Sequence, residues 1–396
     1  MSLKDCNSVS KSSGLFTILQ SKDFCTGCHA CYHICPAKAI KMHPDSEGFL
    51  YPEVNLDKCI ECGRCKKVCP VLNKPAIYSE MQAFAAYAKD ETEHKSSSSG
   101  GVFAVLAKDI LNHGGAVCGA AFTEQLKVQH VIIEEEEALS KLKETKYVQS
   151  EIGEIFLTIK SMLMSGRQVL FSGTPCQVAG LKNFLGEDYP GLFCIDLICH
   201  GVPSPKVFSR YLQEISNKPI VKMTFRNKKM GISKVTLDYE DSDGVVFQEK
   251  YGESPYIIGF IQNLYIRPSC FHCNFKGEKR SSDLTIGDFW GVQEFHPSFI
   301  TEQGVSAVII HTLKGAKAFN EVRSNLVIEL ATTKEISAWN SCLIQSIEPN
   351  QKRKLFFDNW EKQTIQETVL ELCDKKKHEK IGIMDKVKGR IKQWLV

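Results

Sequence analysis

The sequence predicts an α/β protein, α+β overall, in which a cysteine-rich module precedes a larger α/β domain with an antiparallel insertion and a helical C-terminal tail. Three observations support this fold class. A block of four cysteines occurs twice near the N-terminus, two apolar strands run through turns into helices between 166 and 215, and residues 220–252 read as antiparallel hairpins. Two successive strand-to-helix units indicate parallel strands, with a site at their C-terminal ends.

The two cysteine blocks are CTGCHACYHICP, from Cys25 to Pro36, and CIECGRCKKVCP, from Cys59 to Pro70, 34 positions later. This spacing is typical of bacterial ferredoxins that bind two 4Fe-4S clusters, in which the fourth cysteine of each block ligates the other cluster. Zinc also binds CxxC pairs, but the repeated spacing and the two Cys-Pro dipeptides favour iron–sulfur clusters. The predicted ligand sets are Cys25, Cys28, Cys31 and Cys69 for one cluster, and Cys59, Cys62, Cys65 and Cys35 for the other.

The overall composition describes an ordinary soluble protein. The 396 residues are 43% hydrophobic, and 49 basic against 46 acidic residues give a net charge of +3. No stretch interleaves basic and aromatic residues densely, so we expect no nucleic-acid partner. No apolar run approaches the roughly 18 residues of a membrane span, and the first residues do not resemble a secretion signal. Seventeen cysteines, most of them at metal-binding spacing, fit a reducing compartment, so we expect a cytoplasmic protein.

Breaks in composition predict the division of the chain. Residues 71–80 interrupt the cysteine pattern with a proline and polar residues. We therefore expect a leader at 1–20, a twin-cluster ferredoxin module at 21–75, the first part of the main domain at 81–165, its second part at 166–345, and a helical tail at 346–396.

Within the main domain, apolar segments alternate between strand and helix patterns. Residues 83–89, 116–122 and 128–134 are predicted strands, and 100–115 is a predicted helix that two glycines close. After a helix at 154–165, the segment VLFSGTPCQVAGL predicts a strand, a turn and a helix capped by Thr174 with Pro175 behind it. The segment LFCIDLICHGVPSPKVF repeats this plan with Ser204 as the cap.

Four further cysteines lie where chemistry usually occurs in such a fold: Cys176 opens a helix, Cys199 ends a strand, and Cys270 and Cys273 form a CxxC pair. The helix dipole favours a thiolate at the first position, and the strand end faces the same crevice. A third cluster is one interpretation. A buried Cys176 with a separate redox dithiol, or half of a zinc site, is the other, and spacing alone does not separate them.

The segment KSSSSGGVF places serine hydroxyls, free backbone amides and a helix N-terminus at one point, which favours binding of an anion. It lacks the lysine of a Walker loop and the spacing of GxGxxG, and a flexible linker is the alternative. Clusters pass single electrons whereas most organic reductions need two, and a flavin nucleotide connects the two regimes and brings phosphates. The loop residues are Ser98, Ser99, Gly100 and Gly101.

In this order the motifs SSSSGGVF, KYVQS, FSGTPCQVAGL, DLICHGVPSP, RPSCFHCNF and SDLTIGDFWG resemble the beta subunit of coenzyme F420 hydrogenase/dehydrogenase, over about residues 81–290 and more weakly to 345. The resemblance implies a flavoprotein with bound FAD. It also implies that Cys176, Cys199, Cys270 and Cys273 ligate a further 4Fe-4S cluster, and that Ser98, Ser99, Gly100, Gly101, Lys146, Thr174 and Gln177 bind the flavin. Lys146 as a surface lysine and Thr174 as a helix cap are the alternatives.

Two polar residues near these motifs are candidate proton donors to a reduced substrate. His200 follows a cysteine of the predicted third cluster, and Asp288 ends a strand before Trp290. A histidine beside a cluster also tunes it by hydrogen bonding, and GDFWG reads equally as a packed turn.

We therefore expect an iron–sulfur flavoprotein oxidoreductase that relays single electrons from ferredoxin-type clusters through a third cluster to FAD, for two-electron reduction of a small-molecule substrate. Expected partners are an external donor such as ferredoxin or flavodoxin, or a partner redox subunit. The alternatives are an electron-transfer subunit without its own substrate, a true coenzyme F420-dependent oxidoreductase, and a zinc-binding interaction module. The spacing of the motifs leaves open the substrate and the direction of electron flow.

The last residues of the tail form an amphipathic pattern, with Met384, Val387, Ile391, Trp394 and Leu395 on one helical face. A helix that docks on its own domain is the favoured interpretation. Peripheral contact with a membrane surface or with a partner is the alternative.

Overall fold

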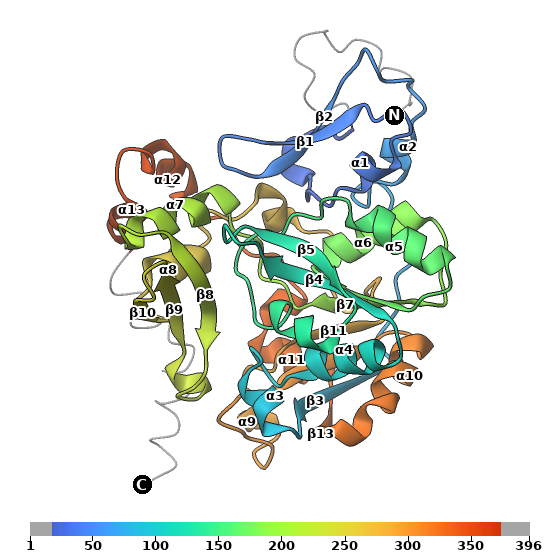
Figure 1. Cartoon of the computed structure of the whole chain (residues 1–396), viewed down its shortest axis with the longest axis vertical. Helices are drawn as coiled ribbons and strands as arrows, with labels where there is room; N and C mark the ends of the chain where they lie inside the picture. Colours follow the sequence, from blue (N-terminus) through green and yellow to red (C-terminus); the bar gives the residue numbers. More distant parts are fainter. Residues whose placement is uncertain (1–17, 374–396) are drawn as a thin grey trace.

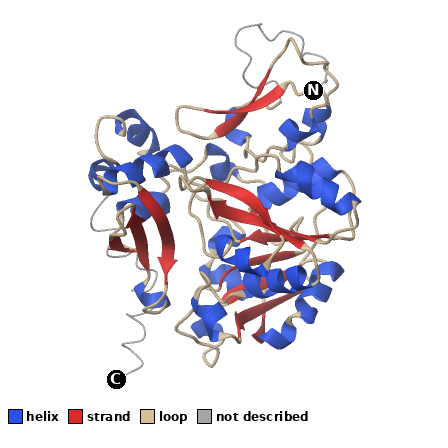
Figure 2. Cartoon of the chain, viewed as in Figure 1, coloured by secondary structure: helices blue, strands red, loops and turns tan. Residues whose placement is uncertain are grey.

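The structure is a computed structural model that describes residues 18–373 (Figure 1). A small domain rich in cysteine packs on an α/β body, and a second small sheet with its own helices lies beside that body (Figure 2). Among the described residues, no helix has the length and apolar character needed to cross a membrane. The amphipathic segment predicted near residues 384–395 lies outside the described residues.

The N-terminal part, residues 18–75, is called the cysteine module here. It contains a two-stranded antiparallel hairpin and two short helices, each of which begins inside a cysteine block. Its core consists of apolar side chains such as Phe49 and Tyr51 packed against the cysteines. The elements are α1 (Ala30–Ile34), β1 (Ile40–Pro44), β2 (Leu50–Val54) and α2 (Arg64–Lys67).

The two cysteine blocks share one backbone conformation despite different side chains. Gly27 and its counterpart Glu61 both have a positive φ, of 67° and 53°. His29 and Gly63 are likewise equivalent, and both are left-handed caps at the start of a helix. The repeat in sequence is therefore a repeat in structure, in which the turn that presents each set of thiols is the same.

The body is an eight-stranded mixed sheet. Apolar runs such as VLFSG and LFCIDL form its centre, where both faces of the strands are covered and hydrophobic residues are continuous rather than alternating. The strands are β3 (Gln82–Ala88), β4 (Ala116–Phe122), β5 (Val128–Ile133), β6 (Val169–Gly173), β7 (Leu192–Leu197), β11 (Leu284–Asp288), β12 (Ser306–Ile310) and β13 (Leu326–Ala331). Their order is β13-β3-β12-β11-β7-β6-β4-β5. The four strands β4, β6, β7 and β11 are parallel, as the strand-to-helix units predict, and the outer strands pair antiparallel.

Helices cover both faces of this sheet. On one face, side chains of α4 and α10 pack on alternate strand residues such as Leu170 and Phe193. On the other face, α5 and α6 pack on Val169 and Phe171, together with the fully buried Cys118 and Cys194. The helices of the body are α3 (Glu91–Lys95), α4 (Val102–Asn112), α5 (Ile155–Met164), α6 (Pro175–Leu185), α9 (Val292–Phe295), α10 (Leu313–Glu321) and α11 (Thr333–Trp339).

The predicted antiparallel insertion is a separate three-stranded sheet with the order β10-β9-β8. Its apolar face joins four helices in one core that contains the fully buried Tyr211, Tyr239 and Tyr256. The last described helix packs against the other three, so part of the predicted tail completes this core. The elements are α7 (Pro205–Ile215), β8 (Ile220–Asn227), β9 (Thr236–Asp241), β10 (Val246–Lys250), α8 (Pro255–Ile261), α12 (Arg353–Asn359) and α13 (Ile365–Leu372).

Candidate functional site

The first cysteine group brings together the thiols of Cys25, Cys28, Cys31 and Cys69. These four residues line one small cavity of the cysteine module. Burial, with a contribution from the neighbouring thiols of Cys69 and Cys25, raises the pKa of Cys28 to about 12. Burial also raises the pKa of Cys31, with contributions from the other three. Iron supplies the positive charge that lets such buried thiols ionise, so the chemistry of this donor set fits a 4Fe-4S cluster.

The second cysteine group is Cys59, Cys62, Cys65 and Cys35. Cys62 is exposed, whereas the other three are half-buried against the core of the module. The backbone N–H of Ala39 donates to Cys35 Sγ at 3.3 Å, the kind of hydrogen bond that tunes a cluster sulfur. Within residues 18–373, no three His, Cys, Asp or Glu side chains are arranged to hold a single metal ion. In a 4Fe-4S cluster each cysteine ligates a different iron.

The third cysteine group is Cys176, Cys199, Cys270 and Cys273, and the structure brings these four residues together. Burial raises the pKa of Cys176 well above its ordinary value, and Cys273, Cys199 and Cys270 all raise it further by their charge. Burial raises the pKa of Cys199 to about 12 and that of Cys270 to about 11. The elements that position them are the first turn of α6, the end of β7 and a 3₁₀ turn at Pro268–His272.

Several polar contacts surround the third group. Thr174 Oγ1 lies 3.1 Å from Cys176 Sγ. Lys276 Nζ donates to the carbonyl oxygen of Cys199 and, at 2.8 Å, to that of Cys342, which places a positive charge beside the thiols. Charge of this kind favours thiolates and an anionic cluster. Neither Lys276 nor Cys342 was a candidate from the sequence, because each stands alone in it.

Helix α6 connects the first and third groups. Cys176 is in its first turn, and Gly180 follows one turn later. A Cβ atom on Gly180 would lie 2.8 Å from Cys28 Cβ and 2.9 Å from Cys28 Sγ, so the absence of a side chain permits this contact. Four residues of helix span only about 6 Å along the axis, so the two cysteine groups are neighbours.

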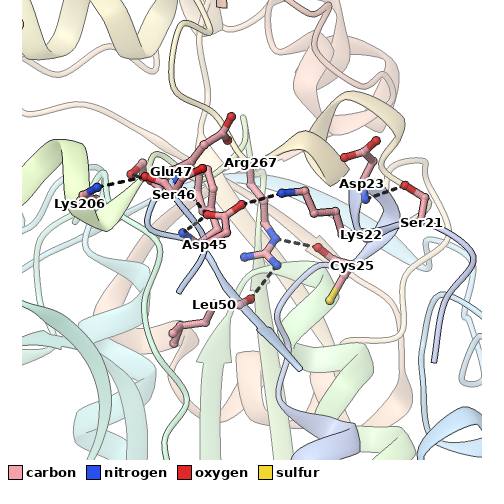
Figure 3. A network of polar contacts seen from close by, with 12 residues as sticks. Ser21, Lys22, Asp23, Cys25, Asp45, Ser46, Glu47, Leu50, Lys206 and Arg267 are labelled. Atoms are coloured by element: carbon pink, nitrogen blue, oxygen red, sulfur yellow. Dashed lines mark hydrogen bonds and ion pairs between the residues drawn. The ribbon is translucent and has the colours of Figure 1, made fainter. Parts of the chain in front are cut away.

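Arg267 holds the cysteine module against the body (Figure 3). Its side chain is fully buried, with Nε donating to the carbonyl oxygen of Cys25 at 2.7 Å and Nη2 to that of Leu50 at 2.9 Å. Nη1 donates to Gln149 Oε1 at 2.9 Å, and the guanidinium lies 4.3 Å from the ring centroid of Tyr51. Arg267, the first residue of the RPSCFHCNF motif, therefore forms a hydrogen bond to the main chain of Cys25 in the first cysteine block.

The KYVQS segment, residues 146–150, forms hydrogen bonds to the cysteine module and to α6. The backbone N–H of Thr145, just before it, donates to Ser98 Oγ at 2.6 Å. Gln149 Nε2 donates to the carbonyl oxygen of Thr26 in the cysteine module at 3.1 Å, and the carbonyl oxygen of Ser150 accepts from Gln177 Nε2 at 3.2 Å. The segment therefore links the serine loop to the first cysteine group across the C-terminal edge of the sheet.

The serine loop is bonded into the body rather than loose. Gly100 N–H donates to Ser306 Oγ at 2.9 Å, and Ser99 Oγ donates to the carbonyl oxygen of Val305 at 3.1 Å. Lys228, which is buried, donates Nζ to the carbonyl oxygen of Ser99 at 2.8 Å and to that of Gln303 at 2.5 Å. A flexible linker does not make these contacts. Gly101 is the left-handed cap of α4.

Basic side chains gather behind this loop. Burial lowers the pKa of Lys228 to about 7, with Arg226 adding to the effect, and burial lowers that of Lys146 to about 8. Lys146 Nζ donates to the carbonyl oxygens of Lys141 and Lys143 at 3.0 and 2.6 Å, so it is not a freely exposed surface lysine. Buried cations whose charge is unfavourable are suited to an anionic ligand, since the anion restores the protonated form. The sequence did not single out Arg226 or Lys228.

Thr174 and Gln177 form a capping box at the start of α6, in which each side chain bonds the backbone of the other. Gln177 is buried, and its amide also fixes the KYVQS segment. Their observed contacts hold the helix that carries Cys176. The capping alternative for Thr174 is thus present in the structure, and a role beside a flavin remains a prediction.

Both candidate proton donors, His200 and Asp288, form polar contacts with neighbouring side chains. Burial lowers the pKa of His200 to about 4; its Nε2 lies 2.7 Å from Asn263 Oδ1, and its Nδ1 lies 3.6 Å from Cys342 Sγ. Asp288 Oδ2 accepts from Arg226 Nη1 at 2.7 Å in a largely buried ion pair. These contacts position neighbouring groups, and the role of either residue as a proton donor remains a prediction.

A cavity of about 250 Å³ lies beside the third group. Pro175 and Asn274, the neighbours of Cys176 and Cys273, line it, together with Lys276 and the linker residues Lys74, Pro75 and Ile77. Arg280 and Asp196 face it from the body, and Arg280 Nε and Asp196 Oδ2 have no hydrogen-bond partner among the described residues. The cavity gives a small polar molecule room next to the third group.

A module with two ferredoxin-type cysteine motifs, fixed on an α/β body, defines an iron–sulfur electron-transfer protein. Comparison with known families agrees with this class. Residues 166–336 match the family described as the C terminus of the beta subunit of coenzyme F420 hydrogenase/dehydrogenase, and residues 24–73 match the 4Fe-4S dicluster domain. The chain is thus similar to coenzyme F420 hydrogenase/dehydrogenase beta subunits over residues 166–336, with a dicluster domain at its N-terminal end.

Three similar proteins come from Methanosarcina mazei, Methanocaldococcus jannaschii and Methanosarcina barkeri. The chain is 23% identical over 325 residues to the F subunit of F(420)H(2) dehydrogenase from Methanosarcina mazei, which corresponds to 77% of this chain and 84% of that protein. It is 33% identical over 68 residues to an uncharacterized polyferredoxin-like protein of Methanocaldococcus jannaschii, 15% of this chain and 39% of the relative. A chain of the xenon-derivatized F420-reducing NiFe hydrogenase complex from Methanosarcina barkeri overlays with a TM-score of 0.47 at 17% identity, covering 73% of this chain and 92% of that one.

Proposed function

We propose that this chain is an iron–sulfur flavoprotein oxidoreductase of the cytoplasm, which relays single electrons from its two ferredoxin-type 4Fe-4S clusters through a further 4Fe-4S cluster to FAD, for two-electron reduction of a small-molecule substrate. In this proposal residues 21–75 hold the first two clusters, and 81–165 and 166–345 form the flavin and third-cluster domain. The ligands are those of the three cysteine groups defined above.

The contact between Gly180 and Cys28 carries this proposal. It places the first cysteine group one helical turn from Cys176 of the third group. The protein contributes position here: Gly180 permits the approach, the capping box fixes the start of α6, and Arg267 prevents the cysteine module from shifting. Electron transfer needs fixed, short separations, and each of these contacts maintains one.

The flavin part of the proposal is supported by the serine loop and the basic side chains behind it. FAD supplies the change from one-electron to two-electron chemistry. Ser98, Ser99, Gly100 and Gly101 would hold its phosphates, Lys146 would neutralise negative charge, and Thr174 and Gln177 would lie near the ring system. The KYVQS segment connects this region to both neighbouring cysteine groups.

A second candidate function is an electron-transfer subunit of a larger complex without its own substrate. The relative from Methanosarcina mazei is by its name one subunit of a dehydrogenase, which favours a partner redox subunit here. A true coenzyme F420-dependent oxidoreductase is a special case of the first proposal. Reduction of coenzyme F420 or another small molecule by the isolated chain would distinguish these functions, since a pure electron-transfer subunit turns over neither.

Loss of one cluster tests the relay directly. We expect Cys270→Ser to lower the iron content by about four atoms per chain and to leave the other two clusters, because each 4Fe-4S cluster needs four thiolates. Cys373→Ser is the matched control, since Cys373 is a buried cysteine in the core between the three-stranded sheet and its helices. Unchanged iron in Cys270→Ser would exclude a cluster at the third group.

A further inference from the structure

The two cysteine blocks share one backbone conformation and differ in their surroundings. In the first block, Gly27, Cys28, His29 and Ala30 are buried beneath α6 and Arg267. In the second block, residues 60–64 are exposed, and a Cβ atom on Gly63 would meet nothing within 4 Å. Among the cysteines of the three groups, Cys62 of the second group is the only one that is exposed.

The surface around this loop combines apolar and basic side chains. Leu56, Ile60 and Leu72 are 59%, 65% and 49% exposed, large values for such residues. Between residues 55 and 74 there are five basic side chains and two acidic ones, which alone give the net charge of +3 carried by the whole chain. The basic residues are Lys58, Arg64, Lys66, Lys67 and Lys74. None of them forms an ion pair within residues 18–373.

We infer that this surface, called the basic face, is the docking site of a small acidic electron-carrier protein. The inference rests on the proposed function in one respect, namely that the second cysteine group holds a cluster. Exposed apolar residues together with basic ones are the composition of a transient protein interface, and cations without an ion-pair partner steer an acidic partner to it. The carrier is oxidised by one electron and the cluster of Cys59, Cys62, Cys65 and Cys35 is reduced by one, with no bond formed or broken.

The arrangement also gives the order of the groups. An electron that enters at the exposed second group is next to the first group in the same module, since Cys65 and Cys31 lie near enough for their charges to interact. The first group contacts α6, which carries Cys176. In this order the second group is the one that would receive the electron from a partner. The first group comes next, and the third group, within the body, comes last.

The test is the double variant Lys66→Glu/Lys67→Glu, reduced by a small acidic two-cluster ferredoxin in an anaerobic stopped-flow instrument. The matched control is Lys334→Glu/Lys362→Glu, which makes the same charge change at two exposed lysines outside the basic face, one in α11 and one between α12 and α13. The signal is bleaching of the visible absorbance of the clusters. Dithionite, which needs no docking site, provides the reference rate, and the iron content of each variant is measured first.

We expect the ferredoxin reaction of Lys66→Glu/Lys67→Glu to be at least about tenfold slower at low ionic strength, because electrostatic steering contributes roughly 10- to 1000-fold to association. The difference should vanish near 1 M salt, where the Debye length is about 3 Å. The control variant and the dithionite rates should not change. Should the first variant lose iron, Lys58→Glu/Arg64→Glu replaces it.

Equal ferredoxin rates for wild type and the basic-face variant would overturn the inference, as would an equal slowing of the control variant, which would show only an effect of net charge. The proposed function fails separately. A chain with about eight irons and no flavin, still reduced by ferredoxin in a manner that depends on Lys66 and Lys67, would refute the flavin relay and support the docking site.

Discussion

Replacement of Arg267 by methionine should loosen the cysteine module from the body. Methionine has a similar length and fills much of the same space, but it donates no hydrogen bond. The change leaves the carbonyl oxygens of Cys25 and Leu50 and Gln149 Oε1 without their donor in a buried position. Each such loss costs about 1–3 kcal/mol, so the three losses together predict a destabilisation of about 3–9 kcal/mol. The attraction of the guanidinium to the ring of Tyr51 is lost as well.

The assay is urea unfolding of the anaerobically purified holoprotein, followed by circular dichroism and by cluster absorbance. Arg323→Met is the matched control, since Arg323 is exposed and should change the unfolding free energy by less than about 0.5 kcal/mol. We expect the cluster absorbance of Arg267→Met to be lost at lower urea than the helical signal, because the module separates first. An unfolding free energy of Arg267→Met within about 0.5 kcal/mol of the wild-type value would show that Arg267 does not hold the cysteine module on the body.

Three further predictions follow from single contacts. Gly180→Ala should lower the iron content by about four atoms per chain, because the new Cβ would lie 2.8 Å from Cys28 Cβ. Alanine is the better helix former, so helix propensity does not explain such a loss. Unchanged iron content would show that the contact is unimportant. Gly27→Ala should lower the melting temperature more than Gly63→Ala, since both positions have a positive φ but only Gly27 would place its Cβ 2.9 Å from Arg267 Nη1; equal shifts would contradict this. FAD affinity should fall by roughly fivefold from pH 6 to pH 9, because Lys228 and Lys146, with pKa values of about 7 and about 8, are charged at the lower pH and neutral at the higher. Calorimetry of FAD binding should show a weaker pH dependence for Lys228→Met than for wild type. A wild-type FAD affinity that does not change with pH would contradict the role of these lysines.

The sequence was most informative where function depends on local spacing. The cysteine blocks predicted the twin motif because each cluster takes three of its ligands from one short loop. The strand-to-helix units were predicted for a similar reason: Thr174, Pro175 and Gln177 form a cap within four residues. The same locality explains why the antiparallel sheet at Ile220–Lys250 could be read from alternation and turn residues.

Contacts between distant segments could not be read in this way. Arg267 bonds to Cys25 across 242 positions, and nothing in its neighbourhood marks it as buried rather than exposed. Lys228 likewise meets the serine loop 129 positions away, so the cations behind that loop became visible only in the fold. The different exposure of the two cysteine blocks is also invisible in sequence, since their spacing is identical and only the packing of α6 and Arg267 on the first block distinguishes them.

The proposed relay is tested most directly by the stoichiometry of iron, acid-labile sulfide, zinc and extractable flavin in the full chain purified without oxygen. The relay requires about twelve irons with matching sulfide, one FAD and no zinc, which correspond to three 4Fe-4S clusters and one flavin. About eight irons without flavin would contradict it, because the third cysteine group would then hold no cluster and the serine loop no cofactor.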